Sequence, residues 1–261
     1  MLTKLLKNDL KKNMRWLWIL FVSTILVAGI TRGFKELGTT IAFFKILGII
    51  FDSLFYALAV NVVLQPFLRN FLNFTKSFYS DNSYLTHTLP VTKNQLINSK
   101  YITAITEIVL GFACLFISIL IMYASPSLDD MLMMLLSTTV SGYVSLWLAV
   151  GLIFTLIIIE FLMYISIIFY SIVVSYRARE RRVLKTFLTT VLMAFVAITI
   201  LSIVMVVVLL TNGVDLSTTT LILPNTAFLG VLISGIVVYT LVSIFFYFMT
   251  KHEFNKGVDV D

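Results

Sequence analysis

The sequence predicts an all-α, polytopic membrane protein with six transmembrane helices and both termini in the cytoplasm. Of its 261 residues, 59% are hydrophobic and 12% are charged, and the mean hydropathy is +1.01. This composition lies outside the range of soluble domains. A helix needs about 20 mostly apolar residues to cross the hydrocarbon core, since unpaired backbone groups in lipid are costly. Six apolar stretches meet this requirement, and the distribution of basic residues gives their orientation.

The predicted spans alternate with short polar or turn-rich segments. The first begins at Met14 and carries Trp16 and Trp18 near its start, residues typical of the membrane interface. After the third span lies a less clear apolar segment, 131–143, which is too short to cross together with its neighbour and which we interpret as a re-entrant or interfacial helix. The six spans are 14–30, 41–65, 102–123, 148–174, 187–210 and 228–249.

Basic residues lie predominantly on one side of these spans. The N-terminal tail, the loop 69–100, the loop after the fourth span and the C-terminal tail together carry 16 of the 19 Lys and Arg residues. By the positive-inside rule, these segments are cytoplasmic. The net charge of +6 is then explained by anionic lipid at the inner membrane surface, so it requires no nucleic-acid partner.

The residues before the first span, 1–13, have the pattern of an amphipathic interfacial helix. Leucines and a methionine share one helical face, and lysines lie mostly on the other. The alternative is an irregular cytoplasmic tail whose lysines serve only orientation. The apolar residues are Leu2, Leu5, Leu6, Leu10 and Met14, and the basic ones are Lys4, Lys7, Lys11 and Lys12.

The cytoplasmic loop 69–100 is a shaped element. The polar run 80–83 is typical of a turn. The following segment, 84–89, is predicted to be a short surface helix that ends at Pro90, because a proline disfavours helical conformation in the residue before it. Thr92 and Gln95 have the spacing of a capping box, which predicts a helix that continues into the third span.

Several catalytic motifs are absent from the sequence. It contains no G-x-x-x-x-G-K-[ST], no H-E-x-x-H and no G-x-S-x-G. Its two histidines, His87 and His252, lie in different cytoplasmic segments, and its single Cys114 excludes an intrachain disulfide and a multi-cysteine metal site. We therefore expect a non-catalytic chain that binds no cofactor or metal of its own.

Four ionisable residues fall within the predicted spans, where such groups are rare. Lys45 is close enough to the outer interface to reach it, and Glu107 is expected to reach the inner headgroups. Asp52 and Glu160 have two interpretations: carboxyl groups held between helices by Ser, Thr or Asn neighbours, or groups on a substrate or ion route or at a subunit interface. The arginines between 177 and 182 are interpreted as a lipid anchor rather than a ligand site.

The order of these parts and the loop sequence FYSDNSYLTHTLPVTKNQLINSKY resemble the ABC-2 type permease family, in the form found in Gram-positive bacteria. The resemblance implies a transmembrane domain over 14–249, a cytoplasmic tail over 250–261, and location in the bacterial cell membrane. It implies a permease subunit that pairs with a second permease, the same or a homologous chain. Separate ATPase subunits would hold the ATP and Mg²⁺.

In that family, a coupling helix in the cytoplasmic loop docks on the ATPase. The resemblance places this element at Tyr84, Leu85, Thr86, His87, Thr88, Leu89 and Pro90. The implied function is export of a hydrophobic or amphipathic substrate, such as a peptide. Two alternatives from other classes are an ion-coupled secondary transporter that uses Asp52 and Glu160, and a membrane scaffold or immunity protein that transports nothing.

Overall fold

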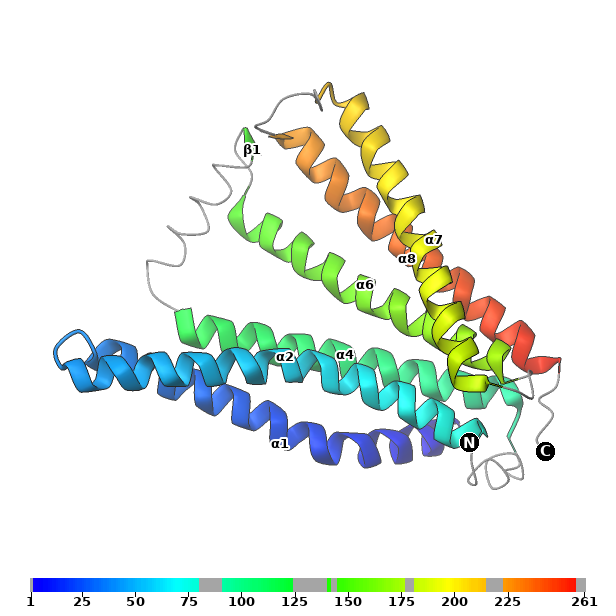
Figure 1. The fold of residues 1–261 in the computed structure, drawn as a ribbon, viewed down its shortest axis with the longest axis horizontal. Coiled ribbons are helices and arrows are strands. Elements are labelled where there is room, and N and C mark those ends of the chain that lie inside the picture. Colours follow the sequence, from blue (N-terminus) through cyan, green and yellow to red (C-terminus); the bar gives the residue numbers. More distant parts are fainter. Residues whose placement is uncertain are drawn as a thin grey trace. The chain divides into compact units, whose positions relative to one another are not determined.

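The computed structural model describes residues 2–79, 91–123, 140–141, 145–176, 181–214 and 223–256. It is almost entirely helical, and six of its helices are long and apolar enough to cross a membrane. The chain divides into two compact units, Met1–Ser125 and Pro126–Asp261 (Figure 1), which are described separately below. The prediction of an all-helical chain with six membrane-spanning segments is confirmed at this level.

The first unit consists of three helices that pack against one another: α1 (Leu2–Leu37), α2 (Ala42–Tyr79) and α4 (Lys93–Tyr123). Its apolar core has two parts, one centred on Leu17, Phe21, Val62 and Cys114, and the other on Ala28, Phe55 and Met122. Every one of these residues lies within a helix whose other side chains are widely exposed. Such exposure of apolar residues is expected where lipid is the solvent.

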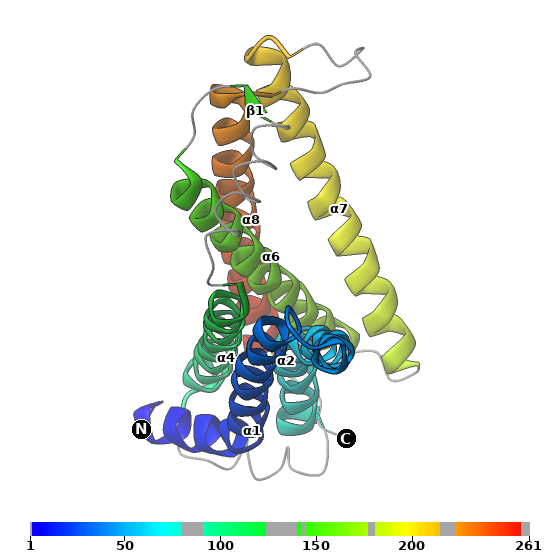
Figure 2. The same cartoon turned by 90° about the vertical axis from the view of Figure 1, so that its left-hand side faces the viewer.

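Each of these helices is longer than the span predicted within it. The 38 residues of α2 extend about 57 Å, whereas the hydrocarbon core is about 30 Å thick. The predicted N-terminal helix is not separate from the first span, because α1 is one helix from Leu2 to Leu37. Figure 2 shows the first turns of α1 at an angle to the rest of that helix.

The second unit contains α6 (Leu146–Ser175), α7 (Arg182–Thr211) and α8 (Asn225–Asn255), which also pack pairwise. The buried residues at its centre are Met163, Ile167, Ala197, Leu201, Tyr239 and Phe246. The fourth, fifth and sixth predicted spans therefore lie within α6, α7 and α8.

Two short strands in the second unit were not predicted. β1 (Val140–Ser141) pairs in parallel with β2 (Leu223–Pro224). Because proline disfavours helical conformation in the preceding residue, Leu223 is extended and α8 begins only at Asn225. The predicted re-entrant or interfacial helix over 131–143 is therefore wrong at Val140 and Ser141, which are extended. Residues 131–139 lie outside the described ranges.

α4 approaches α2 closely at Gly111. A Cβ atom built there would lie 3.0 Å from the carbonyl oxygen of Val62 in α2. Pro66, one turn further along α2, has no N–H to donate to that carbonyl. A side chain at position 111 would therefore press directly against the backbone of α2.

We expect Gly111→Leu to destabilise the protein by about 2 kcal/mol relative to Gly29→Leu, because overpacking a close helix contact displaces backbone. At Gly29 of α1, a Cβ atom has no other atom within 4 Å. Both substitutions remove a glycine from a helix, so the gain in helix propensity is common to them. Thermal unfolding of the two variants in detergent measures the difference, and equal midpoints would show that α2 and α4 do not meet at Gly111.

Candidate functional site

Seven polar residues from all three helices of the first unit, three of them buried and four partly buried, form a group that we call the polar cluster. α1 contributes two residues, α2 three and α4 two. It lies near the end of α2 and the beginning of α4, the two helices that flank residues 80–92. The members are Asp9, Asn13, Arg69, Asn70, Asn73, Lys100 and Glu107.

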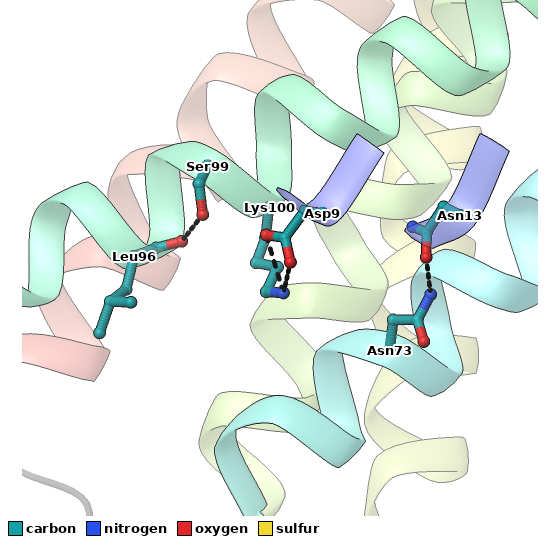
Figure 3. Close-up of polar contacts among 6 residues, drawn as sticks. All are labelled: Asp9, Asn13, Asn73, Leu96, Ser99 and Lys100. Carbon is teal, nitrogen blue, oxygen red and sulfur yellow. Dashed lines mark hydrogen bonds and ion pairs between the residues drawn. The ribbon is translucent and has the colours of Figure 1, made fainter. Parts of the chain in front are cut away.

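The first contact in the polar cluster is an ion pair between α1 and α4. Lys100 Nζ lies 3.0 Å from each carboxylate oxygen of Asp9, as Figure 3 shows. The side chains of Lys100 and Asp9 are only 14% and 19% exposed, respectively. Since little solvent reaches this pair, removal of either partner would leave a largely buried, unpaired charge, which is costly.

The second set of contacts joins α1 to α2 through Asn13. The Asn73 amide donates a hydrogen bond of 2.8 Å to Asn13 Oδ1, with the two side chains facing each other (Figure 3). Arg69 donates to the backbone carbonyl of Asn13 at 3.4 Å, and its guanidinium lies 5.9 Å from the centre of the Trp16 ring. Arg69 and Asn73 are four residues apart, so they share one face of α2.

The third contact joins α2 to α4 through Glu107, whose side chain is completely buried. Asn70 donates from Nδ2 to Glu107 Oε2 at 2.9 Å and to the carbonyl of Pro66 at 2.8 Å. Glu107 Oε1 has no hydrogen-bond partner among the described residues. The expectation that Glu107 reaches the inner headgroups is therefore wrong: it is on the face of α4 that packs inside the unit.

The start of α4 has the predicted capping box. The backbone N–H of Gln95 donates to Thr92 Oγ1 at 3.4 Å, and the Gln95 side chain accepts from the Thr92 N–H at 3.3 Å. From Lys93, α4 is continuous to Tyr123, which confirms that the helix after the cap runs into the third span. Lys100 lies about two turns beyond the cap. The predicted coupling element, 84–90, lies outside the described residues.

Asp52 belongs to a different group, near the other end of α1. Its carboxylate lies 2.9 Å from Lys35 Nζ, and that ammonium group also lies 5.1 Å from the centre of the Tyr123 ring. The Tyr56 and Tyr123 hydroxyls are hydrogen-bonded at 2.7 Å. One of the two interpretations of Asp52 placed Ser, Thr or Asn beside it, but its partner is Lys35, which lies beyond the first predicted span, 14–30. Because α1 continues past its predicted span, Lys35 is within reach.

Glu160, in the second unit, lies among tyrosines. Its carboxyl group lies near the hydroxyls of Tyr164, one turn further along α6, and Tyr239 of α8. Tyr239 is 6% exposed and belongs to the apolar core of this unit. One of the two interpretations of Glu160 placed Ser, Thr or Asn beside it; the polar groups near it are instead aromatic hydroxyls, whose rings also bury apolar surface.

Sequence reasoning singled out only Glu107 among the acidic and amide residues of the polar cluster. It missed Asp9, Asn13, Asn70 and Asn73 as functional candidates. One signal was available: Asn70 and Asn73 are three residues apart, so they lie on one side of a helix that extends the second span. Their partners on α1 and α4 could not be inferred from this spacing.

Among the residues that the structure describes, no three His, Cys, Asp or Glu side chains are grouped as metal ligands would be. Arg181 has a left-handed backbone conformation with φ of 53° directly before α7. The guanidinium of Arg182 lies 5.6 Å from the centre of the Tyr176 ring. Arg177 and Arg179 lie outside the described residues.

The helices and their polar contacts thus define the class of protein: a multi-pass helical membrane protein with a polar cluster. No family model, no curated protein and no solved structure matches this chain.

Proposed function

We propose that this chain is the transmembrane permease subunit of an ABC-2 type exporter in a bacterial cell membrane. Its termini and the loop 69–100 would be cytoplasmic, and separate ATPase subunits would bind below and supply ATP hydrolysis. The observation that carries the proposal is the polar cluster. It joins the two helices that flank the predicted coupling element to each other and to the start of α1.

The polar cluster gives a route for force from the loop into the membrane. The capped helix α4 is continuous from Lys93 to Tyr123, so a displacement at its start moves the membrane part of the same helix. The Asp9–Lys100 ion pair passes that displacement to α1. The Asn70–Glu107 hydrogen bond passes it to α2. A partner that moves the loop would thereby move all three helices.

The exposed residues of α1 fit the proposed cytoplasmic and interfacial position of its first turns. Lys11, Lys12 and Arg15 are exposed, as are Trp16 and Trp18, at 63% and 58%. Basic side chains followed directly by tryptophans are typical of a helix that passes from the inner surface into the hydrocarbon core.

The proposed substrate is hydrophobic or amphipathic, such as a peptide, as the resemblance to ABC-2 type permeases implies. α7 exposes large apolar side chains along much of its length, including Phe187, Leu188 and Phe195 at 66%, 64% and 69%. This exposure is what a lipid-facing helix requires and does not distinguish between substrates. A second copy of this chain, or a homologous permease, would complete the transport pathway.

The proposal is tested by searching the neighbouring reading frames for an ABC ATPase and co-purifying the full chain with its product. We expect the double variant Leu85→Ala/Leu89→Ala to lose most of the bound ATPase, because truncation of the hot-spot residues of an interface costs about 2 kcal/mol or more. The matched control is Lys11→Ala, an exposed change on the same predicted side. If the double variant retains the ATPase as the control does, the coupling element has been misplaced.

One observation favours a second candidate, an ion-coupled secondary transporter. Glu107 is completely buried and one of its oxygens has no hydrogen-bond partner in the described part of the chain, and buried carboxyl groups in membrane helices often serve proton or ion transfer. Proteoliposomes that contain the chain alone distinguish the candidates. Uptake driven by a proton gradient, and abolished by Glu107→Gln, would favour the second candidate; transport only with the ATPase and ATP would favour the exporter.

A further inference from the structure

A pocket of about 420 Å³ lies where α1 turns back into α2. It is at the opposite end of α1 from Asp9 and involves no member of the polar cluster. Its wall combines two lysines and one carboxylate with a hydroxyl and two residues without side chains. The polar residues and glycines of its lining are Lys35, Gly38, Thr39, Lys45, Gly48 and Asp52.

The charges in this pocket do not balance. Lys35 is neutralised by Asp52 at 2.9 Å and is held in place by the Tyr123 ring. Lys45 is exposed and has no ion-pair partner among the described residues. The pocket therefore has one uncompensated ammonium group, and this group belongs to the first turn of α2, where the helix dipole also favours an anion.

Two glycines of the pocket lining let α1 and its turn approach α2 closely. A Cβ atom at Gly38 would lie 2.9 Å from the carbonyl oxygen of Phe34 and 3.0 Å from Lys45 Cα. The turn therefore packs directly against the backbone of Lys45. A Cβ atom at Gly48 would lie 3.8 Å from the Lys35 side chain. This close approach brings Lys35 of α1 and Lys45 of α2 into the lining of one pocket.

The surroundings of Lys45 indicate what kind of anion reaches it. Phe43, Ile46 and Ile49, on the same turns of α2, are 63%, 60% and 61% exposed. In a membrane these side chains contact acyl chains, and a lysine among them directs its ammonium group towards the headgroups. The anion that a lysine meets among the headgroups is the phosphate of an anionic lipid.

We propose that this pocket binds a phosphate group, held by Lys45 and shared by Lys35, and that a phospholipid headgroup provides it. Asp52 is a competitor in this site, because it occupies Lys35 at 2.9 Å. Lys45 and Asp52 therefore have opposite effects on the affinity for phosphate. Loss of Lys45 weakens binding, whereas loss of the Asp52 charge frees Lys35 and strengthens it.

The experiment titrates the full chain in a neutral detergent with phosphatidylglycerol and follows the midpoint of thermal unfolding. We expect a saturable rise, with half-saturation at an about five-fold higher lipid concentration for Lys45→Gln and little change for Lys45→Arg. For Asp52→Asn, half-saturation is expected at a lower concentration than for the wild type, each measured against its own lipid-free baseline. The matched control is Lys11→Gln, an exposed lysine near the other end of α1.

Two further probes identify the source of the phosphate. Diacylglycerol has the acyl chains without the phosphate, and inorganic phosphate has the anion without the chains. A Lys45-dependent rise with phosphatidylglycerol alone supports a lipid headgroup, and one that inorganic phosphate reproduces supports a free phosphate in the same site. The proposal is overturned if diacylglycerol stabilises as well as phosphatidylglycerol, or if Lys11→Gln weakens binding as much as Lys45→Gln.

Discussion

Replacing Lys100 with alanine is expected to destabilise the protein by about 2 kcal/mol, because it leaves the Asp9 carboxylate largely buried without its cation. Removal of one partner from a fully buried ion pair costs roughly 3–5 kcal/mol. The Lys100 and Asp9 side chains are 14% and 19% exposed, so part of the charge remains hydrated. We therefore expect a loss of about 2 kcal/mol, below the range for a fully buried pair. Thermal or denaturant unfolding of the full chain in detergent measures the loss.

The matched control for this prediction is Lys256→Ala in the second unit. Lys256 is 49% exposed, Glu253 is 13% exposed, and the two lie 2.7 Å apart at positions three residues from each other. Because the lysine of this pair is half exposed and its partner is local in sequence, we expect its loss to cost less than the loss of Lys100. The double variant Asp9→Ala/Lys100→Ala should be less destabilised than Lys100→Ala alone, since no uncompensated charge remains. If Lys100→Ala and Lys256→Ala have the same stability, the ion pair does not join α1 to α4.

Replacing Asn70 with alanine has the second large expected effect, about 1–3 kcal/mol of destabilisation. This change removes the hydrogen bond donated to Glu107, whose carboxyl group is completely buried and cannot recover a bond from water. Asn61 is the matched control in the same helix. It donates to the carbonyl four residues earlier at 2.9 Å, as Asn70 does at 2.8 Å, but it is exposed and has no second acceptor.

Asn61→Ala should therefore change the unfolding midpoint only slightly. The double variant Asn70→Ala/Glu107→Ala separates the hydrogen bond from packing: if the bond matters, the double variant is less destabilised than the sum of the two single variants. Exact additivity, together with equal effects of Asn61→Ala and Asn70→Ala, would mean that the Asn70–Glu107 contact contributes nothing to stability.

In an exporter, the same two variants would also affect function. Both break contacts between the helices that flank the predicted coupling element and their neighbours in the first unit. We expect ATP hydrolysis by the partner to continue while transport per hydrolysed ATP falls, because movement of the loop no longer reaches all three helices. The ion-coupled alternative predicts no such separation.

The membrane spans were predictable because the signal is local. A stretch of about 20 apolar residues is helical in lipid whatever surrounds it, since only internal hydrogen bonding satisfies its backbone. Each predicted span accordingly lies within a helix, apart from Ile41, which precedes α2 by one residue. The capping box at Thr92 and Gln95 was predictable for the same reason: its two hydrogen bonds join residues three positions apart.

The ends of the helices were less predictable, because hydropathy reports the lipid-embedded part and not the polar turns beyond it. Lys35 and Asp52 illustrate the consequence. If the first helix ended near Ile30, as predicted, Lys35 would belong to a loop and Asp52 would have no basic neighbour. Because α1 ends at Leu37, Lys35 Nζ lies 2.9 Å from Asp52 Oδ1. The strand pair of Val140 with Leu223 was also missed, since its two partners come from distant parts of the chain.

The sequence by itself determined the class of protein, the six spans, the capped start of α4 and the basic asymmetry that predicts orientation. Only the tertiary structure decided what the polar residues do. Asp9 and Lys100 are 91 positions apart, and Asn70 and Glu107 are 37 apart, so no local pattern relates them. They meet because three helices pack with these faces inward, where a polar group without a partner would be costly and is therefore paired across helices.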